Sequence, residues 1–123
     1  MNEREWLAYH FQRTKPWIEA ALARDVGTHN IEDVWAALET GHAQLWPTQN
    51  AVCVTTIENY PRAKALRGWL AGGNLHEIVE TEPVIRAWAK RMGCDLMLIG
   101  GRRGWLKAFE GYEEAHTVMA RKL

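Results

Sequence analysis

The stretch over residues 65–101 constrains the fold more than any other part of the chain. It contains four parts in order: a strand over 65–70, the glycine pair Gly72-Gly73, a helical segment that ends at Gly93, and an apolar strand over 96–99. Two strands joined by a helix of this length can lie parallel and side by side in one sheet. We therefore expect a strand–helix–strand unit, with the glycine pair at the strand-to-helix turn.

The glycine pair is also where a ligand that carries phosphate would bind. Glycine lets another group approach the backbone closely, and the turn opens onto a helix N-terminus, where free N–H groups and the macrodipole favour an anion. The alternative, which the residues alone favour slightly, is that Gly72-Gly73 only makes a tight turn.

The helical segment that follows contains a proline. Pro83 would clash inside a continuous helix, whereas Thr81 can cap a second helical piece and place Pro83 in its first turn. We therefore predict a break or kink near Thr81. The apolar run over 96–99 is typical of a central strand that is covered on both faces.

Two helices are expected before any strand. Thr14 is a plausible N-cap, with Pro16 in the first turn of a helix that runs to about residue 25. One or two helical turns over 3–12 precede it. Asn30 can cap the next helix, which has apolar residues at helical spacing and stops at Gly41.

The segments between and after these helices complete an α+β fold. Strands are expected over 43–46, 51–57 and 65–70 as an antiparallel meander, followed by the parallel pair around the crossover helix, a short helix over 105–109 and a last strand over 116–120. Together with the two N-terminal helices, this order predicts one mixed sheet in a single domain of residues 1–123.

Composition limits the possible functions. Fifteen basic residues balance fifteen acidic ones, which argues against a general nucleic-acid binder. We expect no membrane segment, no metal site and two reduced cysteines, Cys53 and Cys94, in a protein made in the cytoplasm. The seven tryptophans should be mostly core, and any exposed one would mark a surface for a protein partner.

The order of elements resembles the GCN5-related N-acetyltransferase (GNAT) fold. More narrowly, the chain looks like the small GNAT-like proteins of tailed phages and prophages. The stretches similar to the phage and prophage proteins are Pro16–Leu22, Gln44–Pro47, Trp69–Gly73 and Gly101–Trp105. The stretches that look like the later strand, short helix and turn of the wider GNAT family are Leu96–Ile99, Trp105–Phe109 and Gly111-Tyr112.

The resemblance implies a coenzyme site. Ala71, Gly72, Gly73 and Asn74 correspond to the family loop whose amides hold the pyrophosphate of acetyl-CoA. The stretch has the glycines but neither the usual spacing nor the leading arginine or glutamine, so the loop is degenerate.

Other residues could serve the chemistry of that family. Glu58 could act as general base, Tyr112 could donate to the leaving thiolate, and His76 could carry a proton. The alternatives are a solvated turn residue for Glu58, packing at the sheet edge for Tyr112 and a solvated first turn for His76.

A basic cluster lies near the expected carboxyl end of the parallel pair, where open sheets bind ligands. Its members are Arg102, Arg103 and Lys107, which suit a coenzyme 3′-phosphate or a nucleic-acid backbone. An ordinary charged loop is the alternative.

Two functions follow from the resemblance. The first is a binding or structural protein of a phage particle or its assembly, which acts through virion proteins in the host cytoplasm or the virion. The second is an active acetyl-CoA-dependent N-acetyltransferase. The degenerate loop favours the first, and a nucleic-acid binder fits the balanced charge least.

Overall fold

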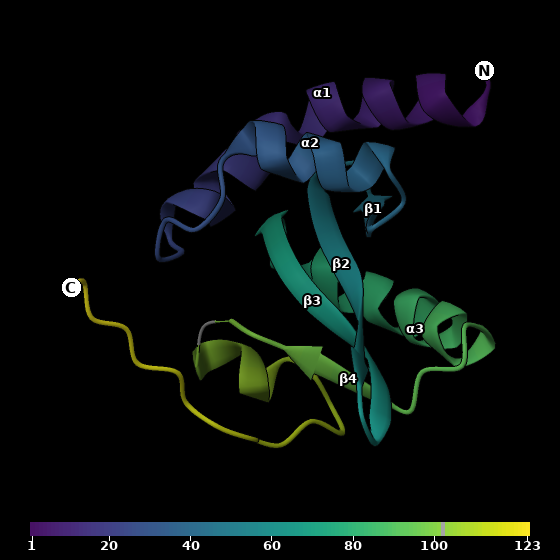
Figure 1. Cartoon of the computed structure of the whole chain (residues 1–123). Helices are drawn as coiled ribbons and strands as arrows, with labels where there is room; N and C mark the ends of the chain where they lie inside the picture. The colour runs from purple at the N-terminus through teal and green to yellow at the C-terminus, as the bar shows by residue number, and fades with distance from the viewer. Residues whose placement is uncertain (102) are drawn as a thin grey trace.

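The computed structural model describes residues 1–101 and 103–123. Its elements are α1 (Glu3–Ala23), α2 (Ile31–Glu39), β1 (Ala43–Pro47), β2 (Ala51–Tyr60), β3 (Ala63–Gly73), α3 (Leu75–Arg91), β4 (Leu96–Ile99) and the 3₁₀ helix η1 (Arg103–Lys107). Figure 1 shows α1 and α2 on one side of the sheet and α3 on the other.

The sheet has the predicted α+β topology. Its strand order is β1-β2-β3-β4, with antiparallel pairing from β1 to β3 and parallel pairing of β3 with β4. The crossover between β3 and β4 is α3, as expected. β2 and β3 are longer than predicted and meet at a turn of Pro61 and Arg62. The expectation that β4 is central was wrong, because it lies at the sheet edge and is only half-buried.

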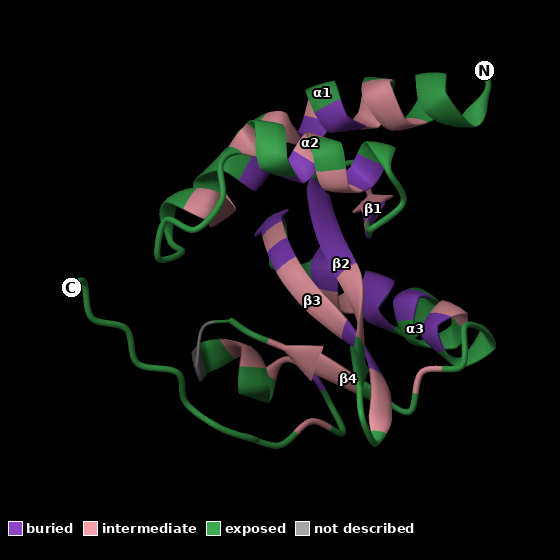
Figure 2. Ribbon diagram, viewed as in Figure 1, coloured by how far each residue is buried: buried purple, intermediate pink, exposed green. Residues whose placement is uncertain are grey.

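Each face of the sheet has its own hydrophobic core. One core joins α1 and α2 to the sheet and contains Phe11, Ile18, Val34, Leu38, Val54 and Leu70 among its buried residues. The other joins α3 and the segment after η1 to the sheet and contains Leu66, Ile78, Ile85, Ala89 and Phe109. Figure 2 shows buried residues along the first half of β2 and on the faces of the helices that cover the sheet, whereas most of β3 is half-buried. Six tryptophans are half-buried against these cores, and Trp6 is exposed.

The predicted start of a helix at Thr14 was wrong, because α1 runs without interruption from Glu3 and its N-cap is Asn2. Thr14 is buried inside α1, and its hydroxyl donates to the carbonyl of His10 at 2.7 Å. The buried Phe11 and Ile18 lie seven residues apart, on the same face and on either side of Pro16. Burying such side chains contributes about 1.5–3 kcal/mol each, which together offsets the roughly 3 kcal/mol cost of an interior proline.

The predicted second cap at Thr81 was also wrong. α3 is continuous through Pro83, and the Thr81 hydroxyl donates backwards to the carbonyl of Glu77 at 2.7 Å. The cause is the same as in α1, because Ile78 and Ile85 bury one helix face on both sides of the proline.

The helix ends that depend on local chemistry were predicted correctly. Asn30 forms a capping box with Asp33 at the start of α2. Gly41 and Gly93 have φ of 80° and 82° after α2 and α3. The amides of Gly93 and Cys94 donate to carbonyls in the last turn of α3, which closes the helix.

The C-terminal part differs from the prediction. The short helix covers Arg103–Lys107 rather than 105–109. The strand expected over 116–120 is absent, since residues 113–123 carry no regular structure and are exposed. Strand propensity is expressed only when a neighbouring edge supplies hydrogen bonds and packing, and this segment pairs with none in the described part of the chain.

Candidate functional site

β3 and β4 pair over four residues and then separate. Their register runs from Ala65 opposite Leu96 to Gly68 opposite Ile99. β3 continues to Gly73, while the chain after Ile99 turns away toward η1. Residues 70–73 of β3 therefore pair with β2 on one side, and residues 69–73 pair with no strand on the other side within residues 1–101 and 103–123. We call residues 69–73 the free edge and the opening beside them the wedge.

A β-bulge lies at the start of the free edge. Thr55 of β2 is opposite Gly68 and Val54 is opposite Leu70, so Trp69 is an extra residue. Trp69 and Leu70 consequently both pack into the core of α1 and α2, although adjacent strand residues normally face opposite ways. A bulge bends its strand, and this one coincides with the point where β4 leaves.

The wedge contains a mostly apolar cavity of about 630 Å³. This volume lies within the range of about 300–1,000 Å³ that is usual for small-ligand pockets. The lining comes from the end of α1 and the following loop, β3, α3, β4 and the segments after it. Members include Arg24, Val26, Arg67, Ala71, Ile78, Glu82, Ile85, Met97, Ile99, Gly100, Trp105, Phe109, Val118 and Ala120.

Glu82 is a buried carboxylate in the cavity wall, with only 8% of its surface exposed. It accepts hydrogen bonds from Arg86 Nε at 3.1 Å and from the Tyr112 hydroxyl at 2.7 Å. Burial, and then this bond to Glu82, raise the pKa of Tyr112, so its phenol stays protonated. The Tyr112 proton is directed at Glu82, and the pair ties the segment after η1 to α3.

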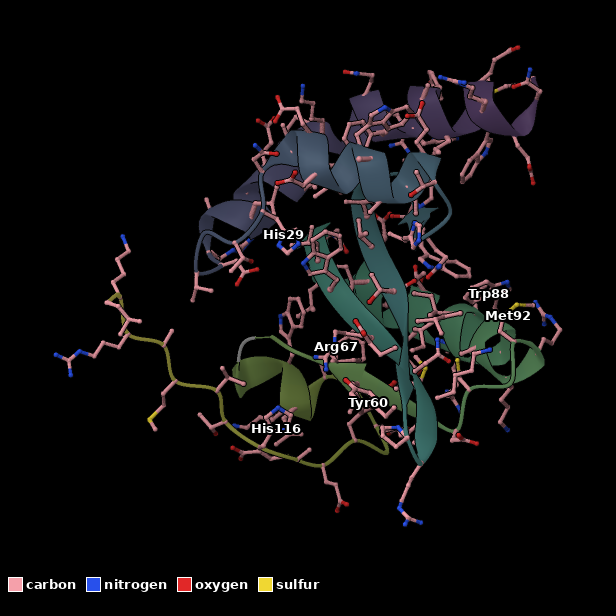
Figure 3. The ribbon with its side chains drawn as sticks, viewed as in Figure 1. His29, Tyr60, Arg67, Trp88, Met92 and His116 are labelled. Carbon is pink, nitrogen blue, oxygen red and sulfur yellow. The ribbon has the colours of Figure 1, made fainter. Side chains whose placement is uncertain are left out.

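Glu58 has partners other than this pair. Its carboxylate is near the β2–β3 turn, where it accepts from the Thr56 hydroxyl at 3.2 Å and lies 3.9 Å from Arg67 Nε. Arg67 also donates to the Tyr60 hydroxyl at 3.0 Å (Figure 3). Arg67 belongs to the described cavity lining, whereas Glu58 and Tyr112 do not. The structure thus gives the two predicted catalytic residues separate partners.

The glycine pair is needed for packing within the chain. A Cβ on Gly72 would lie 2.6 Å from the carbonyl oxygen of Trp17 in α1. Gly73 has φ of 97°, and a Cβ there would clash with the carbonyl oxygen of Asn50. Both glycines are the last residues of β3, so the strand passes to α3 through Asn74 alone.

The first turn of α3 already holds a carboxylate of the chain. Asn74 is the N-cap and accepts from the Glu77 amide at 3.1 Å. The Glu77 carboxylate accepts from the Thr48 hydroxyl at 2.6 Å and the Asn50 amide at 2.8 Å. These bonds, the Thr48 one first, lower the pKa of Glu77. A phosphate group that approached this helix end would meet a negative charge.

The remaining predicted residues lie outside this arrangement. His76 is exposed in the first turn of α3, and its Nε2 lies 2.7 Å from Glu80 Oε1. Lys107 is exposed at the end of η1, which follows the carboxyl end of β4 as expected. Arg103 begins η1, and Arg102 lies outside the described residues. A phosphate-binding role for the basic cluster stays a prediction.

Sequence reasoning missed the wedge. The one signal for it is the adjacent pair Trp69-Leu70, because two large apolar residues in succession break the period of two that a strand otherwise follows. Cys53 also lies in the cavity wall, and burial raises the pKa of its thiol to about 12, so it stays a neutral thiol.

Neither a cluster of metal-ligating side chains nor a membrane-spanning helix occurs in the described residues. Among those that the structure describes, no group of three or more His, Cys, Asp or Glu side chains could hold a metal ion. Within the same part of the chain, no helix combines the length and apolar character that crossing a membrane requires.

Comparison with known proteins places the fold but not the activity. Two solved structures of the protein TTHA1254 from Thermus thermophilus are similar. The wild type has a TM-score of 0.61 and 14% identity over 91% of each chain. A point mutant has a TM-score of 0.60 and 12% identity over 86% of this chain and 87% of the other. At such identities the likeness concerns the fold alone. No family model and no curated protein matches the chain.

Proposed function

We propose that this chain is a binding protein on a GNAT-like scaffold, and that an extended segment of a protein partner enters the wedge. The observation that carries the proposal is the free edge of β3 beside an apolar cavity. An exposed strand edge offers unpaired N–H and C=O groups, and a peptide that adds to it gains main-chain hydrogen bonds. The cavity would then select for apolar side chains on one face of that peptide.

The strand-to-helix turn supports a binding role without acetyl-CoA. Gly72 and Gly73 are in close contact with the chain's own backbone, and the Glu77 carboxylate lies in the first turn of α3. Both features reduce the space and the positive potential that a pyrophosphate would need at this helix end.

The phage part of the proposal is supported by the sequence motifs. Their resemblance to small phage and prophage proteins favours a role in the virion or its assembly, with virion proteins as partners. We expect the gene to lie beside capsid, portal or tail genes, and the protein to be detected by mass spectrometry in purified particles. Metabolic neighbours and absence from particles would contradict this.

An acetyl-CoA-dependent N-acetyltransferase is the second candidate. The wedge favours it, because ligands of open sheets bind outside the carboxyl ends of parallel strands. In that case acetyl-CoA would contact Ala71, Gly72, Gly73 and Asn74, and Arg102 and Arg103 would bind its 3′-phosphate.

Two glycine variants separate the candidates. Gly100 lines the wedge and Gly104 does not, both are exposed, and a Cβ meets nothing within 4 Å at either. Gly100→Trp should therefore obstruct the wedge while Gly104→Trp serves as the matched control.

The test begins with peptides selected from a random heptapeptide library on the wild-type protein. We expect them to alternate apolar and polar residues, and their binding to be lost in Gly100→Trp and kept in Gly104→Trp. Calorimetry with acetyl-CoA should show no micromolar binding. Micromolar binding of acetyl-CoA that only Gly100→Trp abolishes would establish the second candidate instead.

A further inference from the structure

We propose that residues 116–120, here called the tail segment, are a built-in strap that pairs with the free edge of β3 and covers the wedge. The pairing stands on the geometry alone, and its regulatory meaning rests on the proposed function. The proposal gives a role to residues 116–120, which have the sequence pattern of a strand but pair with no strand in the described structure.

The first support is position. Val118 and Ala120 line the same cavity as Leu70 and Ala71 of the free edge. The tail segment nevertheless remains exposed, with 79% of Val118 accessible, and Figure 2 colours the whole tail as exposed. The segment thus lies at the mouth of the wedge without being seated in it.

The second support is the match in pattern and length. The tail segment and the free edge each span five residues, 116–120 and 69–73. In an extended segment, residues 118 and 120 face one side and residues 117 and 119 the other. The residues that reach the cavity, Val118 and Ala120, are the ones that share a face, and both are apolar.

The third support is the anchor before the segment. Phe109 is buried in the core beneath α3, and the Tyr112 hydroxyl is bonded to Glu82 in the cavity wall. Three residues separate Tyr112 from the tail segment. A short tether of this kind keeps the segment at a high effective concentration beside the free edge.

The consequence is competition at one site. The strap and an incoming peptide would use the same N–H and C=O groups of residues 69–73, namely those that point away from β2. A partner would have to displace the strap before it could bind. The apparent affinity of the protein for a peptide would therefore be its intrinsic affinity multiplied by the fraction of molecules whose wedge is open.

Hydrogen exchange of the full-length chain, followed by mass spectrometry, tests the strap without any partner. Val118→Asp places a charge on the face that lines the cavity, and Met119→Asp places the same charge on the other face, where 91% of the side chain is exposed. We expect Val118→Asp to speed exchange of residues 69–73 by about tenfold, the change that loss of a few strand hydrogen bonds would produce, and Met119→Asp to exchange like the wild type.

Equal exchange in the wild type and both variants would overturn the strap, as would equal acceleration by both. Native mass spectrometry should show monomers, and dimers that only Val118→Asp abolishes would overturn the pairing within one chain. Circular dichroism checks that each variant is folded.

The selected heptapeptides then separate this inference from the proposed function. If both are correct, they bind Val118→Asp several-fold more tightly than the wild type or Met119→Asp. If no peptide binds any variant, the proposed function fails while hydrogen exchange still decides the strap. Equal affinity for the three chains, together with unchanged exchange, removes the strap and leaves peptide binding intact.

Discussion

Gly72 determines how closely α1 can approach the sheet. Its backbone lies against Trp17, and a Cβ would come within 2.6 Å of the Trp17 carbonyl oxygen, a contact that side chains essentially never make. The position is therefore restricted to glycine by packing, without reference to any ligand. Packing alone thus explains, at the scale of one residue, why glycine is needed at this position.

Gly72→Ala should consequently destabilise the protein. Overpacking of this kind costs about 1–3 kcal/mol, because α1 must shift away from β3. Urea denaturation followed by circular dichroism measures the change. Gly104→Ala is the control, since a Cβ there meets nothing within 4 Å. An unchanged midpoint for Gly72→Ala would show that α1 is not held as tightly as the structure indicates.

Glu77 links the β1–β2 turn to α3, and its contribution should depend on pH. Hydrogen bonds from Thr48 and Asn50 lower its pKa in the folded state. A group with a lowered folded pKa adds stability above its unfolded pKa, about 4.3 for Glu, and loses it as pH falls through the folded value.

Glu77→Gln should therefore be less stable than the wild type at pH 7, and the difference should shrink below about pH 4. Denaturation midpoints at pH 7 and pH 3 test this. Glu80→Gln is the control, because Glu80 is an exposed carboxylate of α3 that lies beside His76. If Glu77→Gln lowered the denaturation midpoint equally at pH 7 and pH 3, the hydrogen bonds from Thr48 and Asn50 would not depend on the charge of Glu77.

At the scale of elements, Pro16 in α1 and Pro83 in α3 show that burial of one helix face can keep a helix continuous through a proline. Pro83 is exposed within α3, where it removes the amide that would donate to Val79. Pro83→Ala restores that donor, so it should stabilise the protein by about 1–3 kcal/mol. Thermal denaturation measures it, with Val84→Ala as a control that alters no backbone donor. Destabilisation by Pro83→Ala would mean that the proline is needed for the shape of α3.

The same contrast explains what could be predicted from the sequence. Asn30, Gly41 and Gly93 act through bonds within a few residues, so their roles are visible in the pattern. Continuity of α1 and α3 depends on burial against a sheet that lies elsewhere in the chain. The four-strand order was predictable because each connection is short or helical.

The candidate site was less predictable for a related reason. The wedge depends on where β4 stops pairing, on a bulge at Trp69 and on the close contact at Gly72, none of which is local. Glu58 was proposed from its position after a strand and Tyr112 from its position in a family turn. The partner of Glu58 is Arg67 on the adjacent strand, and the partner of Tyr112 is Glu82, thirty residues earlier in α3.

At the scale of the whole molecule, two cores share one thin sheet. β2 and β3 contribute buried side chains to both faces, for example Val54 to the core of α1 and α2 and Leu66 to the core of α3. The helices on each face of the sheet pack against side chains of β2 and β3, so each hydrophobic core depends on these two strands. The layers should therefore unfold together, even though few contacts join the helices of one layer to those of the other.

Leu66→Ala tests this coupling, because Leu66 is completely buried in the core of α3. A truncation of this kind costs about 2–5 kcal/mol. Tryptophan fluorescence, which reports Trp17 and Trp35 on one face and Trp88 and Trp105 on the other, should shift to a lower denaturant midpoint together with circular dichroism. Coincident transitions in the variant indicate one cooperative unit. If the core of α3 melted first and left α1 and α2 folded on the sheet, fluorescence and circular dichroism would separate, and the shared strands would not be sufficient to couple the two faces.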